Sequence, residues 1–116
     1  MQETHTFKIE VSRDGDARIV EIHGALADDA TSRAKEAFLQ VLNENPRKIL
    51  VDLSQLDYIS SSGIGLLVSV LRRCRQRGIS LPVCSLRPDI FDLFRLTRLH
   101  QVFEIFDDRA AALRRP

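Results

Sequence analysis

The sequence predicts a small α/β protein built on one mixed, mostly parallel β-sheet with an N-terminal hairpin and about four helices. Three observations lead to this fold class. The first residues alternate between apolar and polar side chains, which is typical of half-buried strands. After them, apolar runs typical of buried strands take turns with segments of helical period. Because this alternation requires crossover connections, the strands after the hairpin are expected to run parallel.

The first two strands are expected at residues 7–11 and 18–22. Asp14-Gly15 lies between them and is the usual signal of a tight hairpin turn. The chain then changes to a helical period, and the possible caps at its start are Asp28, Asp29, Thr31 and Ser32. One face of this first helix carries apolar residues spaced three or four apart, namely Ala30, Ala34, Ala37, Phe38 and Val41.

A buried strand is expected at residues 48–53, followed by a serine-rich loop and a second helix that ends near Arg77. Gly78 is well placed as the C-terminal cap of that helix. Residues 79–85 read as a further strand that contains Pro82. Because proline cannot donate to the ladder, we expect this strand at an edge or in a bulged position.

A third helix is expected to open at Arg87-Pro88, since proline suits the first helical position. Its apolar residues are Ile90, Phe91, Phe94 and Leu96. A last strand at residues 101–106 and a final helix from Asp107-Asp108 to Leu113 complete the chain. With no repeat or linker between these elements, residues 1–116 are expected to form a single domain.

Composition excludes several function classes. The 17 basic and 16 acidic residues nearly balance, so nothing global points to nucleic acid or a membrane surface. No apolar run is long enough for a transmembrane helix, and the start lacks a signal-peptide pattern. Cys74 and Cys84 have neither redox nor zinc spacing and read as buried apolar residues. We therefore expect a cytoplasmic protein that is monomeric by itself and uses no cofactor or metal.

The loop Ser60-Ser61-Ser62-Gly63-Ile64-Gly65 is the strongest candidate for a functional site. It stands where a strand ends and a helix begins, so free backbone N–H groups and the positive end of the helix dipole favour a negative group there. One serine would suffice as an N-cap. The other two hydroxyls are then unexplained, and from local spacing the choice between plain capping and a phosphate-related role stays open.

Three catalytic or ligand-binding alternatives fit less well. A dinucleotide site would need a third glycine where Val68 stands, and a Walker-type lysine is absent. Serine hydrolysis would need a nucleophile elbow, although His23 and Asp28 offer nominal partners. No set of ligand residues has metal-site spacing. Leu66 and Val70 add a second apolar strip to the helix, which suits either a wide core contact or an exposed partner surface.

Several segments together resemble STAS-domain proteins of the anti-sigma-factor-antagonist type. They are Ile-Leu-Val-Asp-Leu-Ser at 49–54, Tyr-Ile-Ser-Ser-Ser-Gly-Ile-Gly at 58–65, Leu-Phe-Arg-Leu-Thr at 93–97 and Val102-Phe103. Each segment is weak alone, but their order and spacing match over nearly the full length. The resemblance implies a regulatory protein and no enzyme, with phosphorylation at the serine two residues before the loop glycine, which is Ser61.

The resemblance also implies partners. The unphosphorylated chain would bind an anti-sigma factor that is a GHKL-type serine kinase, and a PP2C-type phosphatase would reset the phosphorylated form. Ser60 and Ser62 are secondary acceptor candidates. The expected partner-binding residues surround the loop: Asp28, Asp57, Ser60, Ser62, Gly63, Ile64 and Leu66.

The sequence departs from the family pattern in the loop and elsewhere. Ser60 stands where many members have an aspartate immediately before the target serine, and Arg98 replaces a common glycine. Many members also have Gly-x-Leu-Asp after the second strand. Here Ala27 follows Gly24-Ala25-Leu26, and the acidic residue comes one position later, at Asp28. STAS-like chains also serve as non-switching subunits of transporter or stress-signalling complexes, and a small-anion binding module is a third interpretation. These alternatives remain open at the level of sequence.

Overall fold

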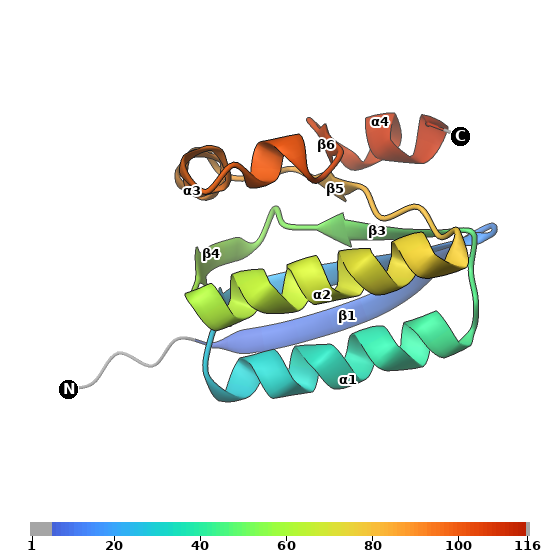
Figure 1. Ribbon diagram of the computed structural model, residues 1–116, viewed down its shortest axis with the longest axis horizontal. Helices are drawn as coiled ribbons and strands as arrows, with labels where there is room; N and C mark the ends of the chain where they lie inside the picture. The colour runs from blue at the N-terminus through green and yellow to red at the C-terminus, as the bar shows by residue number, and fades with distance from the viewer. Residues whose placement is uncertain (1–5, 116) are drawn as a thin grey trace.

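The computed structural model describes residues 6–115 and contains one six-stranded sheet with four α-helices (Figure 1). The strands are β1 (Phe7–Asp14), β2 (Ala17–Leu26), β3 (Lys48–Asp52), β4 (Leu56–Ile59), β5 (Val83–Cys84) and β6 (Ile105–Phe106). The helices are α1 (Asp29–Asn43), α2 (Ser61–Arg77), α3 (Pro88–Leu96) and α4 (Arg109–Arg114), with a short 3₁₀ turn at Leu99–Gln101.

The predicted fold class is confirmed by the strand pairing. The sheet order is β1-β2-β3-β5-β6, and β4 pairs with β2 off this path. Only β1 and β2 pair antiparallel, with Asp14 opposite Ala17 across the turn. Gly15 in that turn has a φ of 59°, a backbone conformation that glycine adopts without steric cost. The remaining pairs are parallel, as crossover connections require.

The main core lies between the sheet and helices α1, α2 and α3. Alternate residues of β2 and β3, such as Ile22 and Val51, meet Phe38 of α1, Leu67 of α2 and Phe94 of α3. A smaller cluster lies on the opposite face, where Ala112 of α4 packs with buried residues of three strands: Ile19, Leu50 and Cys84. In Figure 1, α1 and α2 lie side by side, and α3 and α4 lie near the β5–β6 end of the sheet.

Three strand expectations are corrected. A separate strand, β4, stands between β3 and the serine loop, and only its two end residues are buried, so it lacks the alternation that marks a strand. The strand expected at 79–85 shortens to Val83–Cys84, and the one expected at 101–106 shortens to Ile105–Phe106. The edge position expected for the strand at 79–85 is wrong, because this strand, β5, lies between β3 and β6. Pro82 precedes β5, and its carbonyl accepts a bond from the Val51 N–H.

The structure shows which of several apolar side chains lie in the core, a question that the sequence left open. Leu66 and Val70 are buried at 7% and 3% exposure, so the second apolar strip of α2 belongs to the core. Cys74 and Cys84 are free and buried, as expected. In α3, only Ile90 and Phe94 are buried, whereas Leu96 is 80% exposed. Gly78 caps α2 in the left-handed conformation, as predicted.

Candidate functional site

The candidate site forms where α2 begins, directly after β4. Ser60 is the N-cap of α2, and its hydroxyl accepts a hydrogen bond from the Gly63 N–H at 3.2 Å. The Ser60 N–H donates to the carbonyl of Leu26 at the end of β2, at 3.1 Å. Ser60 therefore satisfies one free N–H of the helix and ties its start to the sheet. Ser60 is therefore the serine that has the capping role expected from the sequence.

Ser62 is the second serine with a hydroxyl partner. Its oxygen lies 2.8 Å from the Ser60 hydroxyl and 3.4 Å from the Thr31 hydroxyl in the first turn of α1. The first turns of α1 and α2 therefore meet through a short chain of hydroxyls. Sequence spacing offered Thr31 only as a possible cap and gave no sign of its contact with Ser62, because that contact depends on how the two helices pack.

Ser61 differs from both neighbours. It is the first residue of α2 and is exposed to solvent. Its hydroxyl makes no hydrogen bond with any residue in the described range 6–115. The three serines are thus chemically distinct: one caps the helix, one bridges two helices, and one presents a free hydroxyl at the positive end of the α2 dipole.

Gly63 explains why α2 starts so close to the sheet. A Cβ atom at this position would lie 2.4 Å from the Leu26 carbonyl oxygen and 2.8 Å from Cγ1 of Ile59. A Cβ atom at Gly65, by contrast, would have nothing within 4 Å. Gly63 therefore permits close packing, which fixes where the serine hydroxyls lie.

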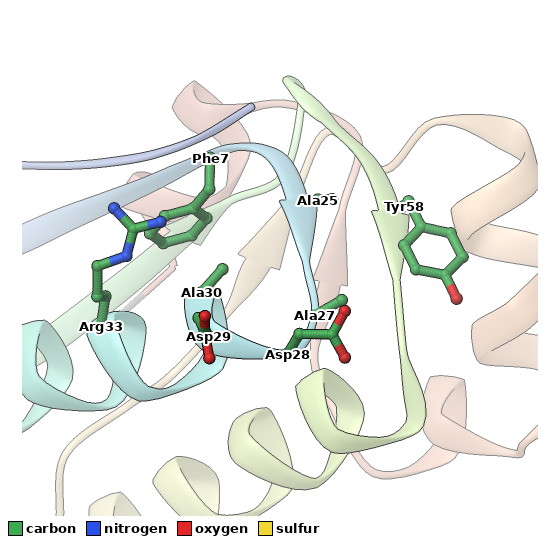
Figure 2. Close-up of a pocket in the computed structure, with 8 residues that line it drawn as sticks. All are labelled: Phe7, Ala25, Ala27, Asp28, Asp29, Ala30, Arg33 and Tyr58. Carbon is green, nitrogen blue, oxygen red and sulfur yellow. The ribbon is translucent and has the colours of Figure 1, made fainter. Parts of the chain in front are cut away.

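A shallow pocket of about 330 Å³ lies beside the site, between the start of α1, the end of β2 and β4 (Figure 2). Its lining residues are Phe7, Ala25, Ala27, Asp28, Asp29, Ala30, Arg33 and Tyr58. The Arg33 guanidinium carbon stacks 4.9 Å from the centre of the Phe7 ring. The pocket thus combines exposed aromatic surface with charged groups of both signs.

Asp28 occupies the N-cap position of α1, but its side chain makes no capping hydrogen bond. Its φ of 53° is unusual for a residue other than glycine. In Figure 2 its carboxylate lies between the start of α1 and β4, and it is exposed. Within the described residues it makes no ion pair, so its charge remains available to an external group.

Some of the other residues expected to contact a partner are exposed, and others are buried. Asp57 is exposed on β4 but does not line the pocket, and Ile64 is half-buried at the start of α2. Leu66 is a correction: it was expected to contact a partner, and its burial in the core removes it from the surface. Gly63 is also buried and acts through packing.

The structure does not form the arrangement that serine hydrolysis would need. His23 lies within β2, three residues before its end, with Nε2 3.2 Å from Glu10 Oε1 and 3.3 Å from Glu21 Oε1. Among the described residues, no histidine hydrogen-bonds a serine hydroxyl. The hairpin register brings together three potential ligand residues, Glu10, Glu21 and His23, that are separated in the sequence.

A half-buried ion pair holds α4 to the sheet away from the serine loop. Arg109 donates to Oδ2 of Asp52 at 2.6 and 3.1 Å, and the Ser54 N–H donates to Oδ1 at 2.9 Å. Burial by itself would raise the pKa of Asp52, but the hydrogen bonds from Ser54 and Arg109 outweigh it and lower that pKa below its ordinary value. Asp52 is therefore a structural carboxylate.

Comparison with known proteins adds a family to this geometry. The family model of the STAS domain matches residues 8–112. The anti-sigma-B factor antagonist of Listeria monocytogenes is 31% identical over 94 residues, which cover 80% of this chain and 82% of that protein.

Two solved structures share the fold. An anti-sigma factor antagonist from Mycobacterium paratuberculosis superposes with a TM-score of 0.82 at 21% identity, covering 93% of this chain and 92% of that one. The anti-sigma factor antagonist SpoIIAA in its unphosphorylated form gives a TM-score of 0.76 at 16% identity, covering 94% and 95%. Within residues 6–115, no helix is both long and apolar enough to cross a membrane.

Proposed function

Because the chain belongs to the STAS domain family, we propose that it is an anti-sigma factor antagonist controlled by phosphorylation of Ser61. The unphosphorylated form binds an anti-sigma factor, and the phosphorylated form releases it. The observation that carries this proposal is the exposed Ser61 hydroxyl, which has no hydrogen-bond partner among the described residues. The names of the relatives support the antagonist role, and the local geometry supports Ser61 as the acceptor.

The hydrogen bonds of the loop favour Ser61 over its neighbours. A phosphate on Ser60 would disturb the bond to the Gly63 N–H and the contact with Leu26. A phosphate on Ser62 would have to separate the first turns of α1 and α2, which its hydroxyl joins. Modification of Ser61 disturbs neither contact. It is the acceptor whose modification costs the fold least.

The fold should tolerate the phosphate. A phosphoserine carries nearly two negative charges, and the free N–H groups and dipole at a helix start stabilise such a group. The change therefore falls on the docking surface. Asp28, whose unpaired carboxylate lines the pocket, already places a negative charge on this surface. A second charge on Ser61 would repel an acidic group of the partner, or would lose its hydration without a counter-charge in a desolvated contact.

The partners follow from the same proposal. The anti-sigma factor is a serine kinase of GHKL type that phosphorylates Ser61, and a PP2C-type phosphatase restores the binding form. The chain itself performs no catalysis in this scheme. Within this scheme the surface around α2 takes the anti-sigma factor, with Asp28, Asp57, Ser60, Ser62 and Ile64 at or near the contact.

Incubation with the cognate kinase tests the acceptor. Mass spectrometry of proteolytic fragments should find one phosphate, on Ser61, and Ser61→Ala should remain unmodified while Ser62→Ala is phosphorylated like the wild type. Ser61→Ala should still bind the anti-sigma factor, because the wild-type hydroxyl makes no hydrogen bond that the substitution would remove. A phosphate found on Ser60 or Ser62 instead would overturn the assignment.

Titration calorimetry with the anti-sigma factor tests the switch. Ser61→Asp should weaken binding by about 2 kcal/mol or more, roughly thirty-fold in Kd, while leaving the unfolding temperature nearly unchanged. Ser12→Asp, an exposed substitution on β1, is the matched control and should bind like the wild type. Equal affinity of Ser61→Asp and wild type would rule the mechanism out.

A further inference from the structure

A side-chain cluster on the β1–β2 hairpin plays no part in the proposed switch. Glu10 and Glu21 are direct cross-strand partners, and His23 follows two residues after Glu21 on the same side of β2. Because side chains alternate along a strand, Glu21 and His23 share the sheet face that Ile19 presents to α4. This is the face opposite α1 and α2.

The distances within the cluster suit a tetrahedral metal ion. His23 Nε2 lies 3.2 Å from Glu10 Oε1 and 3.3 Å from Glu21 Oε1, and all three ligand atoms lie within 4.8 Å of one another. A zinc ion with bonds of about 2.0–2.1 Å to nitrogen and oxygen places its ligand atoms about 3.3 Å apart. The two distances from His23 Nε2 to the glutamate oxygens already have about that length. A small rotation of the exposed Glu10 side chain adjusts the distance between the two oxygens.

The bonding state of His23 is a second observation. Its Nε2 is shielded from solvent and makes no hydrogen bond of acceptable geometry with the described residues, although two carboxylate oxygens are close. A buried nitrogen without a hydrogen bond is costly, and an ion or a water is the usual explanation. The Nε2 atom is thus shielded and lies between two carboxylate oxygens, although the His23 side chain as a whole is 28% exposed.

The remaining oxygens of the two carboxylates have partners of their own. Lys8 Nζ lies 3.6 Å from Glu10 Oε2, and Arg109 lies 3.6 Å from Glu21 Oε2. Each carboxylate therefore has Oε2 near a cation and Oε1 near His23. Metal-ligating carboxylates are commonly oriented by such outer contacts.

We propose that Glu10, Glu21 and His23 bind one divalent transition-metal ion, with zinc the ion that this ligand set suits. Two carboxylates balance the charge of the ion, and the imidazole nitrogen favours zinc over magnesium or calcium, which prefer oxygen alone. Three protein ligands leave the fourth position open to water or to a group from another molecule. Because the ligands come from both strands of the hairpin, the ion ties β1 to β2.

Calorimetric titration of the full chain with zinc chloride tests the proposal. Wild type should bind one zinc ion per chain, and His23→Gln and Glu10→Gln should each lose at least about ten-fold in affinity, the lower end of what even an outer contact costs. His100→Gln is the matched control and should bind like the wild type. Zinc should also raise the unfolding temperature of wild type and leave that of His23→Gln unchanged, because the ion binds the folded hairpin.

Two results would overturn the site. Failure of wild type to bind zinc up to about 100 μM, a weak affinity of about −5.5 kcal/mol, would mean that the three side chains do not form a metal site. Zinc affinity that survives in His23→Gln would place the ion elsewhere, with His5 or the two cysteines as the source. Glu10→Gln, an exposed change on β1, decides the question if His23→Gln fails to fold. Ser61→Asp should bind zinc like the wild type, which separates this site from the switch.

Discussion

Two glycines in the first turns of α2 meet different surroundings. A methyl group at Gly63 would clash with the Leu26 carbonyl oxygen at 2.4 Å, whereas one at Gly65 would meet nothing within 4 Å. Gly63→Ala should therefore destabilise the fold by about 1–3 kcal/mol, because backbone has to move. Gly65→Ala should stabilise it by about 0.5–1 kcal/mol through helix propensity. Urea unfolding measures both, and effects of equal sign would contradict the packing described for α2.

The side chain of Ser60 caps α2. Ser60→Ala removes the bond to the Gly63 N–H and should cost about 1 kcal/mol of unfolding free energy. Ser60→Asp should keep the cap and lose little, since aspartate caps as well as serine and its charge suits the helix dipole. Ser62→Ala is the control, with a smaller loss expected. A larger loss for Ser62→Ala than for Ser60→Ala would reverse the assigned roles.

Among the elements, α4 depends on a lysine from β3. Lys48 is 8% exposed, and its Nζ donates to the carbonyls of Ala112 at 2.8 Å and of Arg115. These carbonyls lie at the end of α4, where the helix leaves acceptors free. Lys48→Met keeps the aliphatic stem and removes the donor, so it should destabilise α4 by about 1.5–3 kcal/mol, the worth of hydrogen bonds to a charged group.

Hydrogen exchange measures that effect locally. Amides of α4 should exchange faster in Lys48→Met, while those of α1 and α2 keep their protection. Lys35→Met, an exposed substitution on α1, is the matched control. Unchanged exchange in α4 would show that the packing of Ala112 and the ion pair of Arg109 hold the helix without Lys48.

Elements with strong periodicity were predictable, and short elements were not. The hairpin followed from alternation and Asp14-Gly15, and α2 followed from its apolar spacing and Gly78. The strand β4 has only two buried residues, and β5 and β6 have two residues each, so tertiary pairing and not local pattern defines them.

The residues of the candidate site were likewise predictable only in part. The serine loop was visible because it is continuous in sequence, and the family resemblance singled out Ser61. The contact of Thr31 with Ser62 was not predictable, since the two residues meet only when α1 packs beside α2. Glu10 and His23 are separated by thirteen positions and meet only through the hairpin register. The burial of Leu66 could not be decided from the sequence, because a core strip and a partner-binding strip have the same spacing.

At the scale of the whole molecule, the ion pair of Asp52 and Arg109 joins β3 in the middle of the sheet to α4 near the C-terminus. Glu21 of β2 lies 3.6 Å from the same guanidinium, so three elements share one cation. Removing the carboxylate by Asp52→Asn should cost about 1.5–3 kcal/mol at pH 7, the worth of hydrogen bonds to a charged group. Urea unfolding at that pH measures the loss.

The same carboxylate makes stability depend on acid. Burial opposes its charge, but the bonds from Ser54 and Arg109 prevail and lower the pKa of Asp52 in the folded chain from 3.8. A depressed pKa means that the unfolded state binds the proton more tightly, so the stabilisation is present above about pH 4 and is lost as the pH falls through the folded value. Wild type should therefore lose more stability between about pH 5 and pH 2 than Asp52→Asn does. Asp16→Asn, at the exposed hairpin turn, should follow the wild-type curve, and parallel curves for wild type and Asp52→Asn would contradict the assignment.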